Sequence, residues 1–359
     1  MKAALAHWTV AVPAASALLL GAALYLPPNP VLTVAYVAAL MAVVVAAVHH
    51  AEVVAHRVGE PFGTLVLALA ITVIEVALVV SMMLAGGPEK AALARDSVYA
   101  AVMIICSGVI GACVLAGALR HREQSFRIEG AGPALAALVT LATMVLILPV
   151  FTTSAPGPHY SKAQLAFTAL TSLSLWAVFV FVQTVRHRDY FLPPEAAQDE
   201  SAHAAPPTLR QAWMSFALLF VSLVAVVGLA KVLSPAIEAA VEAVGAPPAV
   251  IGVAIAALVL LPEAFAAVRA ALANRLQTSM NLALGSALAC IGLTIPAVAL
   301  ASVVLDLPLV LGLEPKDLVL LMLAFVVSTI TLGTGRTHLM QGAVHLVIFA
   351  AFLFLTLVP

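Results

Sequence analysis

Charged side chains are scarce in this sequence. Only 9% of its 359 residues are Asp, Glu, Lys or Arg, and 64% are hydrophobic. A soluble domain carries about 25% charged residues, so this composition predicts a chain that lies in lipid. The net charge of −1 also excludes a nucleic-acid partner, because phosphate binding requires a face rich in Lys and Arg.

Cysteine is scarce as well. The three cysteines, Cys106, Cys113 and Cys290, all lie inside apolar runs. On one helix Cys106 and Cys113 would be about 10 Å apart, which is too far for a disulfide. We interpret all three as small core residues.

Long apolar runs make up most of the chain. A helix of about 20 apolar residues crosses the ~30 Å hydrocarbon core of a bilayer, and eleven runs approach or exceed that length. The first run resembles a signal peptide, but no small-x-small site closes it, so we expect a retained helix. The predicted spans are Trp8–Leu26, Val31–His50, Phe62–Ala85, Ser97–Leu119, Pro133–Phe151, Ala163–Val185, Gln211–Leu233, Pro248–Leu272, Thr278–Val304, Asp317–Leu332 and His338–Leu357.

The basic residues are distributed unevenly between alternate loops. With the N-terminus inside, eleven Lys and Arg fall on the cytoplasmic side and five on the other side, which predicts a cytoplasmic N-terminus and an outside C-terminus. Residues 186–210 are the one long polar segment. We interpret it as a solvated linker rather than a cation sensor, although it contains Asp189, Glu195, Asp199 and Glu200.

Two segments on either side of this linker resemble each other. FGTLVLALAITVIEVALVV and VIGVAIAALVLLPEAFAAV each place one acid, Glu75 or Glu263, near the middle of an apolar helix. In the next helix, SGVIGAC from Ser107 aligns with NLALGSA from Asn281. The pairs lie five spans apart, and an odd offset reverses direction, as in the inverted repeats of secondary transporters.

These observations predict an all-α, polytopic membrane protein with about 11 transmembrane helices. We expect one extra N-terminal helix in residues 1–30 and a first inverted five-helix repeat in residues 31–185. The linker in 186–210 would then lead to a second repeat in residues 211–359.

Glu75 and Glu263 form the candidate ion and proton site, and the candidate metal ligands. A charged carboxylate at the centre of a spanning helix costs about 2.5 to 3.5 kcal/mol and usually serves an ion or a proton. If the repeats bring the two together, one divalent cation or two protons would neutralise them. The alternative is a structural contact with a shared proton. Other acids are predicted at helix ends, where water solvates them: Glu52, Asp96, Asp306 and Asp317.

Further oxygen ligands are needed, because Ca²⁺ takes six to eight oxygens. The candidates are the Asn281 amide and the hydroxyls of Ser107, Ser286 and Thr72. For Ser107 and Thr72 the alternative is a hydrogen bond to the carbonyl four residues back.

Proline and glycine near the acids point to exposed backbone oxygens. Pro262 lacks an N–H and so frees the carbonyl of Leu258. Gly252 and Gly285 are predicted to allow close helix approach or local unwinding.

At these residues the sequence resembles a known family. The segments GEPFGTLVLALAITVIEVALVVSMML from Gly59, RDSVYAAVMIICSGVIGACVLAGALRH from Arg95, VQTVRHRDYF from Val182 and LPEAFAAVRAALANRLQTSMNLALGSALACIGLTIPAV from Leu261 are similar to ChaA-type calcium/sodium:proton antiporters of the cation/calcium exchanger superfamily. The resemblance implies two inverted five-helix repeats plus one helix in a bacterial inner membrane. It also implies export of Ca²⁺ or Na⁺, and in some members K⁺, against proton entry.

The resemblance extends to single residues. Glu75 and Glu263 match the repeat acids, and Asn281 matches the repeat asparagine. Ser107 stands where the first repeat commonly has Asn, and the loss of one amide carbonyl would weaken Ca²⁺ coordination.

Ca²⁺/H⁺ exchange is the leading hypothesis, and Na⁺/H⁺ or K⁺/H⁺ exchange at the same pair is the alternative. We expect inorganic cations, protons and membrane lipid as partners and no resident cofactor, and the sequence leaves the oligomeric state open. An intramembrane enzyme would need a Ser/His or paired-Asp constellation in the core, so we favour it less, as we do a passive channel. His338 and His345, seven residues apart on one helix face, are interpreted as packing residues rather than a proton relay or a metal pair.

Overall fold

The computed structural model describes residues 2–23, 25–26, 29–59, 62–192 and 207–359. In this part of the chain ten helices are long and apolar enough to cross a membrane, and an apolar stretch, Trp8–Ala23, precedes them. The eleven predicted spans and the helical fold are thereby confirmed. Three acids of the predicted linker, Glu195, Asp199 and Glu200, lie outside the described residues.

Seven of the eleven spans are uninterrupted α-helices. They are α1 (Lys2–Ala23), α2 (Pro30–Val58), α3 (Phe62–Gly86), α9 (Leu209–Ala243), α10 (Ala249–Leu272), α13 (Pro315–Leu332) and α14 (Leu339–Leu357). In lipid the backbone has no water to bond, so a continuous apolar run satisfies its own N–H and C=O groups as a helix.

The other four spans each contain a π-helical segment. The first three are α4 (Leu93–Met103), η2 (Ile104–Val109) and α5 (Ile110–His121); α6 (Ile128–Ala142), η3 (Thr143–Ile147) and α7 (Leu148–Phe151); and α8 (Lys162–Phe181) with η4 (Val182–Arg186). The fourth joins α11 (Leu276–Ala289), η7 (Cys290–Thr294) and α12 (Ile295–Val304). We return to η2 and η7 below because π-helical segments often occur at functional sites.

Two helices run beyond the predicted apolar spans. Helix α2 continues past His50 to Val58, and α9 continues past Leu233, through Pro235, to Ala243. At ~1.5 Å per residue the 35-residue α9 is about 52 Å long, which exceeds a ~30 Å hydrocarbon core. A helix can therefore keep its form where its side chains turn polar.

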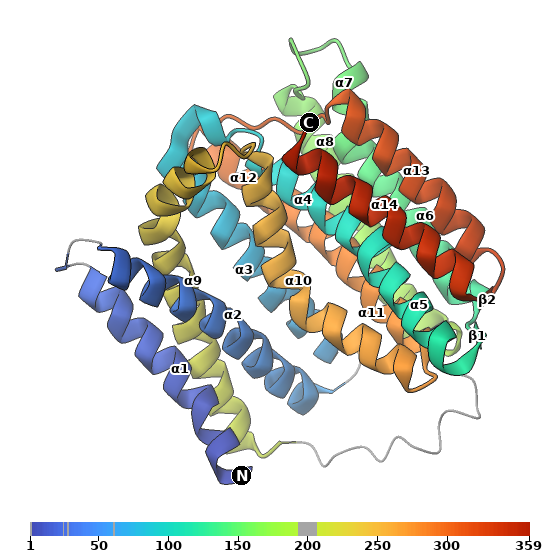
Figure 1. Ribbon diagram of the computed structural model, residues 1–359, viewed down its shortest axis with the longest axis horizontal. Coiled ribbons are helices and arrows are strands. Elements are labelled where there is room, and N and C mark those ends of the chain that lie inside the picture. The colour runs from blue at the N-terminus through green and yellow to red at the C-terminus, as the bar shows by residue number, and fades with distance from the viewer. Residues whose placement is uncertain (1, 24, 27–28, 60–61, 193–206) are drawn as a thin grey trace. The chain divides into compact units, whose positions relative to one another are not determined.

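The helices gather into two compact units. The first unit comprises Met1–Lys90 and Ala204–Pro248. In this unit α9 lies against α1, α2 and α3, and α2 also contacts α1 and α3 (Figure 1). The His50 Nε2–H donates to the carbonyl of Thr9 at 2.8 Å and so joins α2 to α1.

The second unit comprises Ala91–His203 and Ala249–Pro359. Here α10 packs against α4, η2 and α5 of one span and against α11, while α14 packs against α5, η2 and α13. A two-residue strand pair, β1 (Gln124–Ser125) and β2 (Arg336–Thr337), joins the loops that follow α5 and α13. Each unit thus draws helices from both sides of residues 186–210.

Candidate functional site

Glu263 lies in the apolar second half of α10, and both of its carboxylate oxygens are buried. The helix continues unbroken through Pro262. Its neighbours in the second unit are the span from Leu93 to His121 and helix α11. The helix that carries Glu263 therefore packs against a span from the other side of residues 186–210.

Two contacts show which residues of the neighbouring span lie level with Glu263. At one end, a Cβ added to Gly252 would stand 2.8 Å from the Asp96 carbonyl carbon and the Ser97 nitrogen. At the other end, His121 Nε2 lies 2.9 Å from the carbonyl oxygen of Leu272, so α10 runs parallel to the span from α4 to α5. Eleven residues separate Gly252 from Glu263 and also Asp96 from Ser107, which places Glu263 at the level of η2.

The π-helical segments occupy equivalent places in the two halves of the chain. Glu263 follows Glu75 by 188 residues, and η7 begins 186 residues after η2. The alignment of Ser107 with Asn281 has a spacing of 174 residues. The spacing of the π segments thus lies within two residues of the spacing of the two acids, and the sequence alignment of the following helix differs from both.

Ser107 lies in η2 and is fully buried. Its hydroxyl donates to the carbonyl oxygen of Met103, four residues back. This is the local hydrogen bond that competes with ion coordination for serines in apolar helices. The hydroxyl oxygen keeps its capacity to accept.

Asn281 lies in α11, where its amide joins two other segments. Its Oδ1 accepts from Gln277 Nε2 at 2.9 Å, and its Nδ2 donates to the carbonyl of Phe191 at 2.5 Å. Gln277 in turn accepts from the Arg127 backbone N–H at 2.7 Å. These three hydrogen bonds hold the 3₁₀ turn η5 (Arg188–Phe191) and the start of α6 against α11. The sequence did not reveal this role of Asn281.

Ser286 is half-buried on α11, one turn beyond Asn281. The Ser279 hydroxyl donates to the carbonyl of Ala267 at 2.7 Å, so the antiparallel helices α10 and α11 bring Asn281 and Ser286 to within about one turn of Glu263 along the helix axis. The second unit therefore gathers four of the predicted residues in one layer: Glu263, Ser107, Asn281 and Ser286.

Glu75 and Thr72 lie one turn apart on α3 in the first unit, and both are buried, with 3% and 7% of their surfaces exposed. The pairing of Glu75 with Glu263 stays a prediction.

The two glycines predicted to allow close helix approach behave differently. Gly252 confirms the expectation, because its backbone lies against that of Asp96 and Ser97. For Gly285 the expectation is wrong: a Cβ there would meet no atom of the described residues within 4 Å, and the helix is regular at this point. A glycine in an apolar run does not by itself reveal whether a second backbone approaches it.

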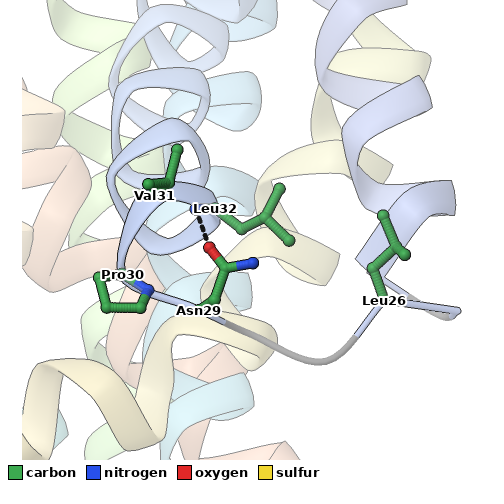
Figure 2. Close-up of a pocket in the computed structure, with 5 residues that line it drawn as sticks. All are labelled: Leu26, Asn29, Pro30, Val31 and Leu32. Carbon is green, nitrogen blue, oxygen red and sulfur yellow. Dashed lines mark hydrogen bonds between the residues drawn. The ribbon is translucent and has the colours of Figure 1, made fainter.

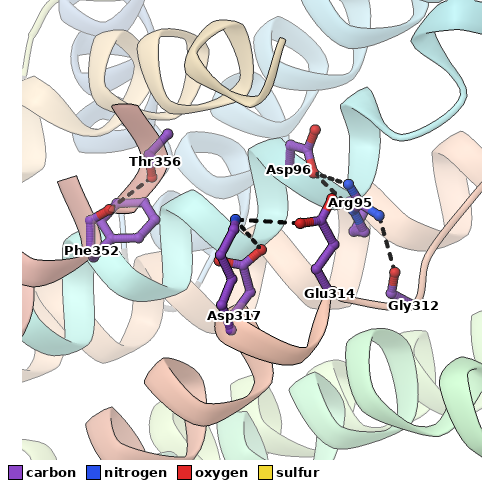
Figure 3. A network of polar contacts seen from close by, with 8 residues as sticks. Arg95, Asp96, Gly312, Glu314, Asp317, Phe352 and Thr356 are labelled. Carbon is purple, nitrogen blue, oxygen red and sulfur yellow. Dashed lines mark hydrogen bonds and ion pairs between the residues drawn. The ribbon is translucent and has the colours of Figure 1, made fainter. Parts of the chain in front are cut away.

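Two acids predicted to be solvated at helix ends are instead mostly buried and paired, so that expectation is wrong for them. Arg95 makes an ion pair with Asp96 at 2.8 Å and also donates to the Gly312 carbonyl at 3.1 Å (Figure 3). Lys316 lies 3.4 Å from Asp317 and 3.4 Å from Glu314. These acids already have basic partners, which lowers their attraction for a cation. Glu52 and Asp306 are exposed, as predicted.

A shallow pocket opens at the start of α2 (Figure 2). Its lining residues are Leu26, Asn29, Pro30, Val31 and Leu32. The one polar side chain among them, Asn29, accepts the Leu32 N–H at 2.9 Å and so caps the helix. None of the five carries a charge, so we do not assign the exchange site to this pocket.

A polytopic helical fold with an acid buried in a spanning helix is typical of one class, the membrane-embedded transporters of ions. Comparison with known proteins identifies the family. The family model described as sodium/calcium exchanger protein matches residues 29–185 and 214–358. The chain belongs to this family of cation exchangers.

Two curated bacterial relatives and one solved structure support this assignment. The protein y4hA of Sinorhizobium fredii is 53% identical over 89% of this chain and 87% of that protein. The sodium-potassium/proton antiporter ChaA of Escherichia coli is 34% identical over 85% of this chain and 83% of its own length. The structure of YfkE has a TM-score of 0.72 and 18% identity, covering 98% of this chain and all of that one, which shows a shared fold.

Proposed function

We propose that this protein is a Ca²⁺/H⁺ antiporter that works by alternating access at a site containing Glu75 and Glu263. The observation that carries the proposal is the buried carboxylate of Glu263, held in α10 at the level of η2. Placing a carboxylate there costs free energy, and binding a cation or a proton offsets that cost.

The charge of the site accounts for exchange. Two ionised carboxylates are costly in a closed, low-dielectric state, whereas one Ca²⁺ or two protons neutralise them. The loaded forms can therefore change their exposure from one side of the membrane to the other, and the empty form does so rarely. Coupling of Ca²⁺ movement to opposite proton movement follows.

The remaining ligands are proposed to be uncharged oxygens. Among the described residues no group of three or more His, Cys, Asp or Glu side chains is placed to hold a metal ion. Ca²⁺ needs more oxygens than two carboxylates provide. We propose Ser107, Ser286, Asn281 and Thr72 as contributors, together with backbone oxygens near the π segments.

Substitution of the acids tests this proposal. Glu75→Gln and Glu263→Gln should each reduce proton-driven ⁴⁵Ca²⁺ uptake into everted vesicles by at least about 30-fold, because removing one partner of a buried charged contact costs about 2 to 5 kcal/mol. Glu52→Gln is the matched control, since Glu52 is exposed near the end of α2, and it should retain transport. Full transport by both core variants would refute the site.

Exchange of Na⁺ or K⁺ for protons is the second candidate. It is favoured by the relative from Escherichia coli, which is a sodium-potassium/proton antiporter and 34% identical. Parallel ²²Na⁺, ⁸⁶Rb⁺ and ⁴⁵Ca²⁺ flux under an imposed pH gradient distinguishes the candidates. Absence of gradient-driven flux for all three ions would exclude both.

The proposed location is the bacterial inner membrane, with a cytoplasmic N-terminus and an outside C-terminus. The support is the bacterial origin of the relatives and the eleven-to-five bias of basic residues. Reporter fusions at the two ends, active only on one side of the membrane, test the orientation.

A further inference from the structure

His345 lies in α14 and is fully buried, and both of its ring nitrogens make hydrogen bonds. Nδ1 lies 2.7 Å from the backbone oxygen of Cys106 in η2, and Nε2 lies 3.0 Å from the Thr331 hydroxyl in α13. Because a carbonyl oxygen only accepts, Nδ1 must carry the proton. In the neutral ring Nε2 then accepts from Thr331.

The π segment explains why the Cys106 oxygen is available to a side chain. In a regular α-helix this oxygen would accept the N–H of Ile110, four residues later. That N–H instead bonds the oxygens of Ile105 and Ser107. A buried carbonyl without its helical partner needs another donor, and His345 provides it from a different helix.

Close backbone packing holds His345 against η2. A Cβ at Gly111 would stand 2.8 Å from the His345 Cβ, and one at Gly342 would stand 2.6 Å from the Leu115 nitrogen. The two helices therefore approach each other through one glycine each. His345 lies beside this close approach of α5 and α14.

Segment η2 also contacts α10, and Glu263 lies at its level in the same unit. A shift of η2 would therefore change the surroundings of the Glu263 carboxylate. Among the described residues, the side chain shown to bond the Cys106 oxygen is that of His345.

We propose that His345 is a positioning residue for cation exchange: its Nδ1–H holds the Cys106 carbonyl and so fixes η2 beside the helix that carries Glu263. This inference rests on the proposed function of Glu263 as a cation ligand. It assigns a role to a residue whose hydrogen-bond partner is 239 positions away in the chain.

Three variants separate this role from simple packing. His345→Asn keeps an N–H donor at the position of Nδ1, His345→Leu removes it, and Thr331→Val removes only the partner of Nε2. Purified variants in proteoliposomes would be assayed for KM and Vmax with the ion that the wild type transports. We expect KM to rise about tenfold in His345→Leu, the equivalent of one hydrogen bond. His345→Asn and Thr331→Val should stay within about threefold of the wild type.

An NMR measurement of the His345 tautomer completes the test and does not depend on transport activity. In protein labelled with ¹⁵N-histidine, the resonance lost in His345→Asn should show the tautomer with the proton on Nδ1. A proton on Nε2 alone, an unchanged KM in His345→Leu, or an equal loss in the Asn and Leu variants would overturn the inference. Absence of ion flux in the wild type would refute the proposed function and leave the tautomer assignment intact.

Discussion

The Asn281 side chain stabilises the fold through two hydrogen bonds and is also a proposed cation ligand. Its amide joins Gln277 to the Phe191 carbonyl, and Gln277 is almost fully buried. The Asn281 oxygen has two lone pairs, so a bound cation would share this oxygen with the Gln277 N–H. Loss of a buried hydrogen-bond partner typically costs about 1 to 3 kcal/mol.

Asn281→Ala should therefore reduce stability. We expect the free energy of unfolding to fall by about 1 to 3 kcal/mol, seen as a lower thermal midpoint of the purified protein in detergent. Asn281→Asp, which keeps the acceptor oxygen but replaces the donor to Phe191 with a second acceptor, is the comparison. An unchanged midpoint together with a raised KM for the cation would show that Asn281 acts as a ligand and does not stabilise the fold.

The acids were predictable from sequence because a Glu inside an apolar run is a local signal. Glu75 and Glu263 needed no knowledge of their neighbours to be identified. His345 was not predictable as a partner of η2, since its bond joins positions 239 residues apart and reaches a backbone atom. No residue type signals a freed carbonyl.

At the scale of helices, Gly252 allows the backbones of α10 and α4 to approach each other. Gly252→Ala should force α10 away from α4, because the new Cβ would stand 2.8 Å from backbone atoms of Asp96 and Ser97. Overpacking of this kind costs about 1 to 3 kcal/mol, so we expect a lower thermal midpoint and reduced transport.

Gly285→Ala is the matched control for this substitution. The site is open among the described residues, and alanine is favoured over glycine in a helix interior by about 0.5 to 1 kcal/mol. Its thermal midpoint should stay the same or rise. Equal losses in the two variants would contradict the packing argument.

The spans themselves followed from sequence, and their ends and internal geometry did not. Apolar length predicts that a helix crosses lipid, but α2 and α9 continue beyond the apolar run because polar residues also form helices at the membrane surface. The π segment Ile104–Val109 contains the pair Ser107 and Gly108, but a serine and a glycine in an apolar run do not by themselves predict a π turn.

At the scale of the whole molecule, a bound cation should stabilise the folded chain. A ligand at one hundred times its Kd adds about 2.7 kcal/mol to the free energy of unfolding. We expect CaCl₂ to raise the thermal midpoint of the wild type and not that of Glu263→Gln, with NaCl and KCl at equal ionic strength as comparisons. Protons compete for the carboxylates, so the rise should shrink on acidification.

Failure of every one of these salts to shift the wild-type midpoint would contradict a cation site in the folded protein. A shift with NaCl or KCl but not with CaCl₂ would favour the monovalent candidate.

The division of the chain into units has a consequence for its synthesis. Helices α1 to α3 precede α9 in the sequence, yet all four belong to one unit, and the second unit begins between them. At about 5 to 20 residues per second, roughly 8 to 30 s pass between translation of the end of α3 and translation of the end of α9. For that time the early helices wait in the bilayer without their partner, so the insertion machinery or surrounding lipid must protect their unfilled faces until the ribosome delivers it.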